Sequence, residues 1–139
     1  MARSSGSVNP ITNEVQFSDL GVSFTAHPVT KKLPVFKNAE AVKKAVKNLI
    51  LTSRFERPYE PLFGCNIYDR LFENFDPIEE ANLKKDIEQA IKNYEPRAIL
   101  EDVIVRANYD QNELYITIRF RVVNQVEPVD LQVVIQRTR

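Results

Sequence analysis

The sequence predicts an α+β fold in which an N-terminal extended arm precedes two to three helices that pack on one face of a small antiparallel C-terminal sheet. Between residues 38 and 94, apolar side chains recur at helical spacing, whereas from residue 103 to 136 they mostly alternate with polar ones, as in half-buried strands. Because the helices precede the strands instead of alternating with them, the order favours α+β over a βαβ arrangement.

The length of 139 residues and the apolar and charged contents of 43% and 27% indicate one domain with its own core. Residues 1–13 are mostly small and polar and predict a flexible arm, so residues 14–139 form the expected domain. From residue 15 to 35 the scattered apolar residues predict extended chain with at most a short hairpin. The only histidine, His27, precedes a proline there, which favours a structural role.

The first helix is predicted to begin at Asn38, a favourable N-cap residue. Its opposite side carries Lys43, Lys44 and Lys47, which fits a solvated face or a surface for an acidic partner. The segment after this helix contains Pro58 and other residues that exclude a regular helix. Its apolar side chains predict a loop packed against the core, and they are Phe55, Tyr59, Leu62 and Phe63.

A short amphipathic helix is expected from residue 68 to 75. A longer helix follows, with Asp76 and Glu79 as a capping box around Pro77, and it ends before Pro96. Three strands joined by a hairpin turn at residues 110–113 complete the chain. The residues expected to be buried together are Val46, Leu49, Ile50, Ile87, Ile91, Val105, Ile116 and Ile118.

Composition excludes several function classes. The 19 basic and 19 acidic residues cancel, so no overall attraction to nucleic acid or to an anionic membrane is expected. No segment has the apolar run that a secretion signal or a membrane span needs. The single cysteine, Cys65, fits a reducing compartment. No phosphate-binding glycine loop or zinc-ligand cluster occurs, so we predict no catalytic residue, no cofactor and no metal site.

Two weaker interpretations can be stated from the residues. Arg106, Arg119 and Arg121 beside Tyr115 on the wet face of the sheet have the composition of a nucleic-acid-stacking surface, but a solvated face explains them equally well. A glycosidase needs two facing carboxylates. Glu56 and Glu60 lie near each other in the proline-rich loop, yet proximity in sequence does not place them across a cleft.

Two Glu-Arg motifs interleaved with prolines are the most distinctive local feature. One comprises Glu56, Arg57, Pro58, Glu60 and Pro61, which we interpret as a structural motif. The other comprises Glu95, Pro96 and Arg97. In extended chain, Glu95 and Arg97 project to the same side. A local salt bridge and a rigid pair of charges that docks into a partner both fit this pattern.

The stretches "NLILTSRFERPYEPLFGCNIYDRLFE" and "NYEPRAIL" closely resemble the baseplate wedge protein family of T-even-like contractile-tailed phages, whose members include the corresponding subunit of type VI secretion baseplates. The similarity extends from about residue 24 to residue 135 and is absent from the N-terminal arm. The resemblance implies a structural, non-enzymatic protein of the virion tail baseplate that is made in the host cytoplasm.

The resemblance also implies partners. Glu95, Pro96 and Arg97 would dock on the helical core bundle of the larger wedge proteins, and the C-terminal strands would accept strands from the first ring of tail sheath protein. A contact with the tail tube or hub stays open. Some members carry a lysozyme-like label, so a peptidoglycan hydrolase is the enzyme alternative, and a binding module of the host cytoplasm is a third.

The last strand is the expected sheath contact, through Leu131, Val133, Val134 and Ile135. In a three-stranded meander this strand lies at an edge, and an edge without prolines or charges pairs readily with a foreign strand. The alternative is that the extended segment from residue 15 to 24 covers this edge within the same chain.

Overall fold

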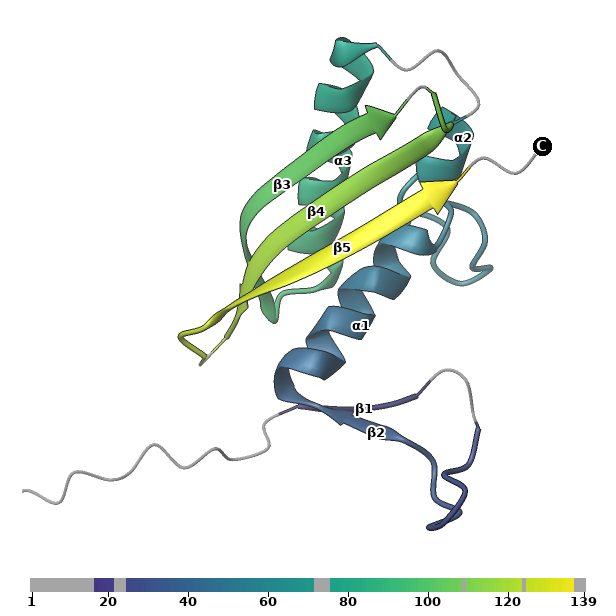
Figure 1. The fold of residues 1–139 in the computed structure, drawn as a ribbon, viewed down its shortest axis with the longest axis vertical. Coiled ribbons are helices and arrows are strands. Elements are labelled where there is room, and N and C mark those ends of the chain that lie inside the picture. The colour runs from purple at the N-terminus through teal and green to yellow at the C-terminus, as the bar shows by residue number, and fades with distance from the viewer. Residues whose placement is uncertain (1–16, 22–24, 72–75, 109, 124, 137–139) are drawn as a thin grey trace, which may run out of the picture.

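The computed structural model describes residues 17–21, 25–71, 76–108, 110–123 and 125–136 (Figure 1). The elements are β1 (Ser18–Leu20), β2 (Val35–Lys37), α1 (Asn38–Leu51), α2 (Ile67–Leu71), α3 (Pro77–Tyr94), β3 (Ala98–Asn108), β4 (Glu113–Val122) and β5 (Pro128–Gln136). The predicted arm, residues 1–13, lies outside the described residues, as do Phe72 and Phe75 of the expected short helix.

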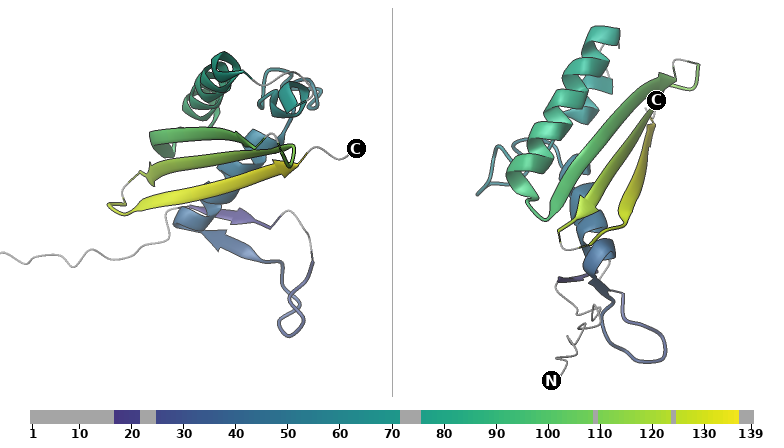
Figure 2. Two further views of the ribbon diagram at one scale, coloured as in Figure 1. Left: turned by 45° about the horizontal axis from the view of Figure 1, so that its top comes forward. Right: turned by 90° about the vertical axis from the view of Figure 1, so that its left-hand side faces the viewer.

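The C-terminal strands form an antiparallel sheet in the order β3-β4-β5. Ile116 in the central strand lies opposite Val105 on one side and Val133 on the other. Alternate residues of β4 are buried, because its side chains point in turn to the helices and to solvent. The helices cover one face of this sheet (Figure 2), which confirms the predicted α+β fold.

The core lies between this face and the helices α1 and α3. Each helix contributes one apolar stripe, as its spacing predicts. All of the predicted core residues are buried except Val105, which is partly buried and packs against the core. The largest fully buried side chains are Phe120, Leu49, Ile50, Ile67, Leu83, Ile87, Ile91, Leu114, Ile116 and Ile118.

Two predicted helix caps differ from the structure. Asn38 is the first residue of α1, and Lys37 occupies the N-cap position. The Asn38 backbone has a positive φ of 47°, and its side-chain oxygen accepts a bond from the N–H of Phe17 at 3.3 Å. Asp76 is the N-cap of α3, but its side chain makes no capping hydrogen bond, and Glu79 pairs with Arg70 of α2 instead of closing a capping box.

The N-terminal strands β1 and β2 pair with each other at the start of α1 (Figure 1). In the described part of the chain β1 therefore does not cover the edge of β5, so the intramolecular alternative is not seen there. His27 lies in the connecting loop, where its Nδ1 accepts bonds from the backbone N–H groups of Val29 and Thr30 at 3.3 Å. This geometry is that of a turn-stabilising residue.

The loop after α1 is less buried than predicted. Phe55, Tyr59 and Leu62 are exposed, and only Phe63 packs against the core. Backbone hydrogen bonds hold the loop, from Phe55 N–H to the Pro61 carbonyl at 2.8 Å and from Cys65 N–H to the Thr52 carbonyl at 2.9 Å. Because these bonds and the packing of Phe63 and Cys65 anchor the loop, its tip can remain in solvent.

Candidate docking site

The Glu95–Pro96–Arg97 motif forms the junction between α3 and β3. The helix ends at Tyr94 because Pro96 lacks an N–H and disfavours a helical conformation of the preceding residue. The N–H of Glu95 still donates to the Ile91 carbonyl at 2.8 Å, and the N–H of Ala98 donates to the Glu95 carbonyl at 3.0 Å. The junction is thus a hydrogen-bonded turn that directs the chain from the helix into the sheet.

Glu95 and Arg97 form a two-point salt bridge. The Nε of Arg97 lies 2.6 Å from Glu95 Oε1, and its Nη2 lies 2.9 Å from Oε2. Glu95 is only 6% exposed, the one buried charged residue in the described part of the chain. The hydrogen bonds that Arg97 donates to Glu95 raise the pKa of the guanidinium, so Arg97 stays protonated. The local bridge that the sequence left open is therefore present.

Arg97 also connects the junction to β1. Its Nη1 lies 3.5 Å from Asp19 Oδ2, and its guanidinium carbon lies 5.5 Å from the ring centroid of Phe17. Asn38 holds Phe17 in place through the backbone bond from Asn38 N–H to the Phe17 carbonyl at 2.8 Å. The guanidinium thus lies between two segments that are far apart in the sequence.

The second motif orders the loop that follows α1. Glu56 accepts a hydrogen bond from the N–H of Ser53 at 3.0 Å, and Arg57 lies 3.9 Å from Glu60. The Arg57 guanidinium stacks 3.9 Å above the ring centroid of Phe63. The prolines of the motif are exposed. These contacts lie within the loop, and they also place the Arg57 cation over an aromatic ring at the surface.

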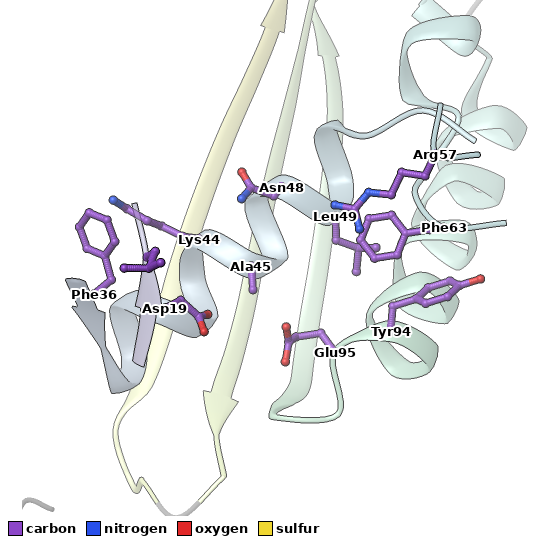
Figure 3. A pocket seen from close by; sticks show the side chains of 11 residues that line it. Asp19, Phe36, Lys44, Ala45, Asn48, Leu49, Arg57, Phe63, Tyr94 and Glu95 are labelled. Atoms are coloured by element: carbon purple, nitrogen blue, oxygen red, sulfur yellow. The ribbon is translucent and has the colours of Figure 1, made fainter. Parts of the chain in front are cut away.

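The structure brings the two motifs together. Phe63 and Tyr94 form an edge-to-face pair with centroids 5.1 Å apart. Next to this pair lies a pocket of about 220 Å³ between the β1–β2 hairpin, α1 and the loop (Figure 3). It is lined by Asp19, Leu20, Phe36, Lys44, Ala45, Asn48, Leu49, Arg57, Phe63, Tyr94 and Glu95.

The residues of the expected sheath contact lie in β5. Leu131, Val133 and Ile135 are buried against the helices, whereas Val134 is 51% exposed on the opposite face. Most apolar side chains of β5 therefore belong to the core. The part of β5 that remains accessible along its free edge is the backbone. In the described residues, no strand pairs with the edge of β5 that faces away from β4.

Of the three arginines considered for nucleic-acid binding, Arg119 and Arg121 are paired with carboxylates. On the outer sheet face, Arg119 makes two hydrogen bonds to Asp130, at 2.8 and 3.2 Å, and Arg121 lies 3.8 Å from Glu101. These cations are thus offset by carboxylates. Neither Glu56 nor Glu60 lines the pocket. The described residues contain no cluster of ligands that could hold a metal ion.

Among the described residues, no helix combines the length and the apolar character that crossing a bilayer requires.

Comparison with known proteins identifies the family. The model of the family "Baseplate wedge protein gp25" matches residues 37–127, which include both Glu-Arg motifs and most of the sheet. The chain belongs to this family. The baseplate wedge protein gp25 of Enterobacteria phage T4 is 36% identical over 90 residues, or 65% of this chain and 68% of the T4 protein. As a gp25 family member, the chain is a component of the contractile tail baseplate of a virion.

Two solved structures have a similar arrangement of helices and strands. A candidate tail lysozyme from Geobacter sulfurreducens is 25% identical with a TM-score of 0.64, covering 72% of this chain and 91% of that one. A chain of the anti-feeding prophage baseplate is 24% identical with a TM-score of 0.60, covering 85% and 83%. The arrangement of helices and sheet described above thus recurs in these proteins.

Sequence reasoning did not identify Asp19, Phe17 and Lys44 as neighbours of the motifs. Asp19 and Phe17 lie in a short segment without a clear period, and Lys44 was one of three similar lysines on a helix. The pairing of β1 with β2 next to α1 brings Asp19 and Lys44 to the pocket. The ring of Phe17 lies near Arg97 instead. No local signal in the sequence carries that information.

Proposed function

We propose that this gp25 family protein is a non-enzymatic subunit that docks on larger baseplate wedge proteins through Glu95, Pro96 and Arg97. We also propose that β5 templates the first ring of tail sheath protein by accepting its strands. A contact with the tail tube or hub is compatible with both roles.

The observation that carries the docking proposal is the fixed position of the Arg97 guanidinium. Glu95 holds it at two points and Asp19 lies on its other side, yet the Arg97 side chain keeps 28% of its surface exposed. A cation that is already ordered loses little conformational entropy when a partner binds it. The junction is therefore suited to present one defined charge next to the pocket.

The two outer edges of the sheet support the templating proposal. The N–H of Ala107 in β3 donates to Glu80 of α3 at 3.3 Å, and the N–H of Val103 donates to Asp102 at 2.8 Å. The β3–β4 ladder is also irregular between Leu100 and Asp102. Carboxylates and a bulge of this kind block strand addition. No such side-chain bond to the β5 backbone occurs in the described residues, so β5 is the edge suited to pair with a foreign strand.

The docking proposal is tested with the double variant Glu95→Met and Arg97→Met, because replacing both charges avoids leaving one of them buried alone. The variant is expected to keep a cooperative melt and to be absent from baseplates reconstituted with the other wedge proteins of its system. Lys92→Met, on the exposed end of α3, is the control. A folded double variant that enters baseplates at the wild-type level would refute docking through this motif.

One observation favours the alternative of a peptidoglycan hydrolase, namely the structural similarity to the candidate tail lysozyme. Against it, both oxygens of Glu95 accept bonds from Arg97, and Glu56 and Glu60 lie on an exposed loop outside the pocket. Clearing of a peptidoglycan suspension is expected to be no faster than with buffer. Clearing that is lost in Glu56→Gln or Glu60→Gln would establish hydrolysis instead.

A further inference from the structure

Two cations on the rim of the pocket lie on aromatic rings. The Lys44 ammonium lies over the ring of Phe36, and the Arg57 guanidinium lies over the ring of Phe63. Figure 3 shows these two pairs on opposite sides of the pocket, with Leu49 and Ala45 between them. A ring attracts a cation through its electron-rich face but leaves its net charge uncompensated. Both cations are therefore positioned and still able to bind an anion.

The charges around the pocket are unevenly balanced. In the described part of the chain, no carboxylate lies within ion-pair distance of Lys44. Arg57 has only Glu60, at 3.9 Å with both side chains about half exposed, and such a pair contributes little. Asp19 and Glu95 also line the pocket, and both contact Arg97, which offsets much of their charge. Lys44 and Arg57 are therefore the charges of the pocket lining with the least compensation from a neighbouring side chain.

The interior of the pocket is suited to a side chain. Its volume of about 220 Å³ is much larger than a water molecule needs, and Leu49 and Ala45 give it an apolar floor. The position of Leu49 and Ala45 on α1, one turn apart, fixes this floor in a stable helix. The site thus combines one apolar cavity with a cation on each side.

We propose that this pocket binds an acidic segment of another protein, with an apolar side chain of that segment in the cavity and carboxylates against Lys44 and Arg57. The proposal rests on the assignment to the baseplate, where a protein partner lies close. Its contact residues are Lys44 and Arg57, whereas Glu95 is part of the pocket wall and Arg97 is not in the lining. It also gives Lys44 a role that distinguishes it from the other lysines of α1. Charge complementarity, not the motif itself, is the basis of recognition.

The test is a charge reversal in the full-length protein. Lys44→Glu with Arg57→Glu is compared with Lys85→Glu with Lys92→Glu, which makes the same change of charge on exposed positions of α3. Each variant carries an affinity tag and is co-expressed with the other baseplate proteins of its system, and the fraction that co-purifies is measured at low and high salt. The rim variant is expected to retain at least tenfold less partner at low salt than the control, while its melting temperature stays near that of the control.

Each outcome decides the proposal. Wild-type capture that falls with salt, together with loss in the rim variant only, supports an acidic partner. Equal capture by the rim variant and the control overturns the proposal, and so does capture that is insensitive to salt. A change in the self-association of the isolated chain would mean that a second copy fills the pocket and would overturn it as well. The Glu95→Met and Arg97→Met variant, run in parallel, reports separately on the motif.

Discussion

The carboxylate of Glu95 is nearly buried, and both of its oxygens accept hydrogen bonds from the guanidinium of Arg97. This pair joins the end of α3 to the start of β3, and through Asp19 it reaches β1. The same residues that the sequence singles out as a docking motif are therefore part of the fold. Any test of docking has to separate these two roles.

Arg97→Ala alone is expected to destabilise the isolated protein, because it leaves the Glu95 carboxylate buried without its partner. Breaking a buried pair from one side typically costs about 3–5 kcal/mol. A motif that served docking alone could lose Arg97 with little effect on the isolated fold, but here the Glu95 carboxylate is buried. Urea melts of Arg97→Ala beside the Glu95→Met and Arg97→Met variant measure the difference. A single variant as stable as the double one would show that an unpaired Glu95 carboxylate costs nothing at this site.

Ile116→Ala tests the core. Ile116 is 1% exposed at the centre of β4, so its truncation is expected to cost about 2–5 kcal/mol. Ile104→Ala is the matched control, because Ile104 lies on the outer face of the same sheet and is 43% exposed. Denaturant melts should separate the two variants clearly. A loss below about 1 kcal/mol for Ile116→Ala would contradict the assigned buried face.

The sequence predicted the elements with a clear period and the face that each one buries. The stripes of α1 and α3 and the alternation in β4 depend on local spacing, which is visible in the sequence. The caps were harder, since Asn38 and Glu79 each found a partner from another element, Phe17 and Arg70 respectively. Such long-range bonds override the local preference, and local pattern cannot reveal them.

The candidate site was predicted only in part. The sequence placed Glu95 and Arg97 on the same side of extended chain, whereas in the structure they come together across a hydrogen-bonded turn. The burial of Glu95 is not visible in the local pattern either. The exposed position of Tyr59 was not expected, because the sequence shows an apolar residue and not the backbone bonds that hold its loop. Tertiary packing, not local pattern, determines both features.

Gly64→Ala is expected to disturb the loop that carries Arg57. Gly64 has a φ of 105°, and a Cβ placed there would lie 2.2 Å from the carbonyl oxygen of Thr52. The backbone would have to move, at a cost of about 1–3 kcal/mol or more. Thermal melts and proteolysis of the loop would register the change. A variant with wild-type stability and unchanged proteolysis would argue that the loop adjusts freely.

Cys65 is expected to react slowly with thiol reagents while the protein is folded. Burial raises the pKa of its thiol from 9.0 to about 11, so at pH 8 the reactive thiolate is scarce as well as inaccessible. Labelling with a maleimide should become fast only across the urea unfolding transition. Labelling in native buffer at the rate of an unfolded cysteine peptide would show that the region around Cys65 opens readily.

The backbone of β5 has a definite outward side. The N–H of Ala107 points away from β4, since it donates to Glu80. Ala107 lies opposite Leu114 in the β3–β4 ladder, and in an antiparallel pair both residues direct their N–H groups either toward each other or away from each other. The N–H of Leu114 therefore points away from β3, toward Ile135 of β5. The next residue along, Val134, therefore directs its N–H to the free edge. Its side chain is exposed as well.

Val134→Pro should consequently remove one donor from the free edge and leave the ladder between β4 and β5 in place. The expected result is a folded protein that still enters baseplates but supports few or no sheaths, because a sheath strand can no longer pair along the whole of β5. Electron microscopy of assembled tails measures sheath length, and a thermal melt checks the fold. Val133→Pro is the contrasting variant, since it interrupts a bond to β4 and should destabilise the sheet itself. Sheaths of normal number and length on Val134→Pro baseplates would exclude β5 as the template, because a strand cannot pair fully along an edge that lacks this donor.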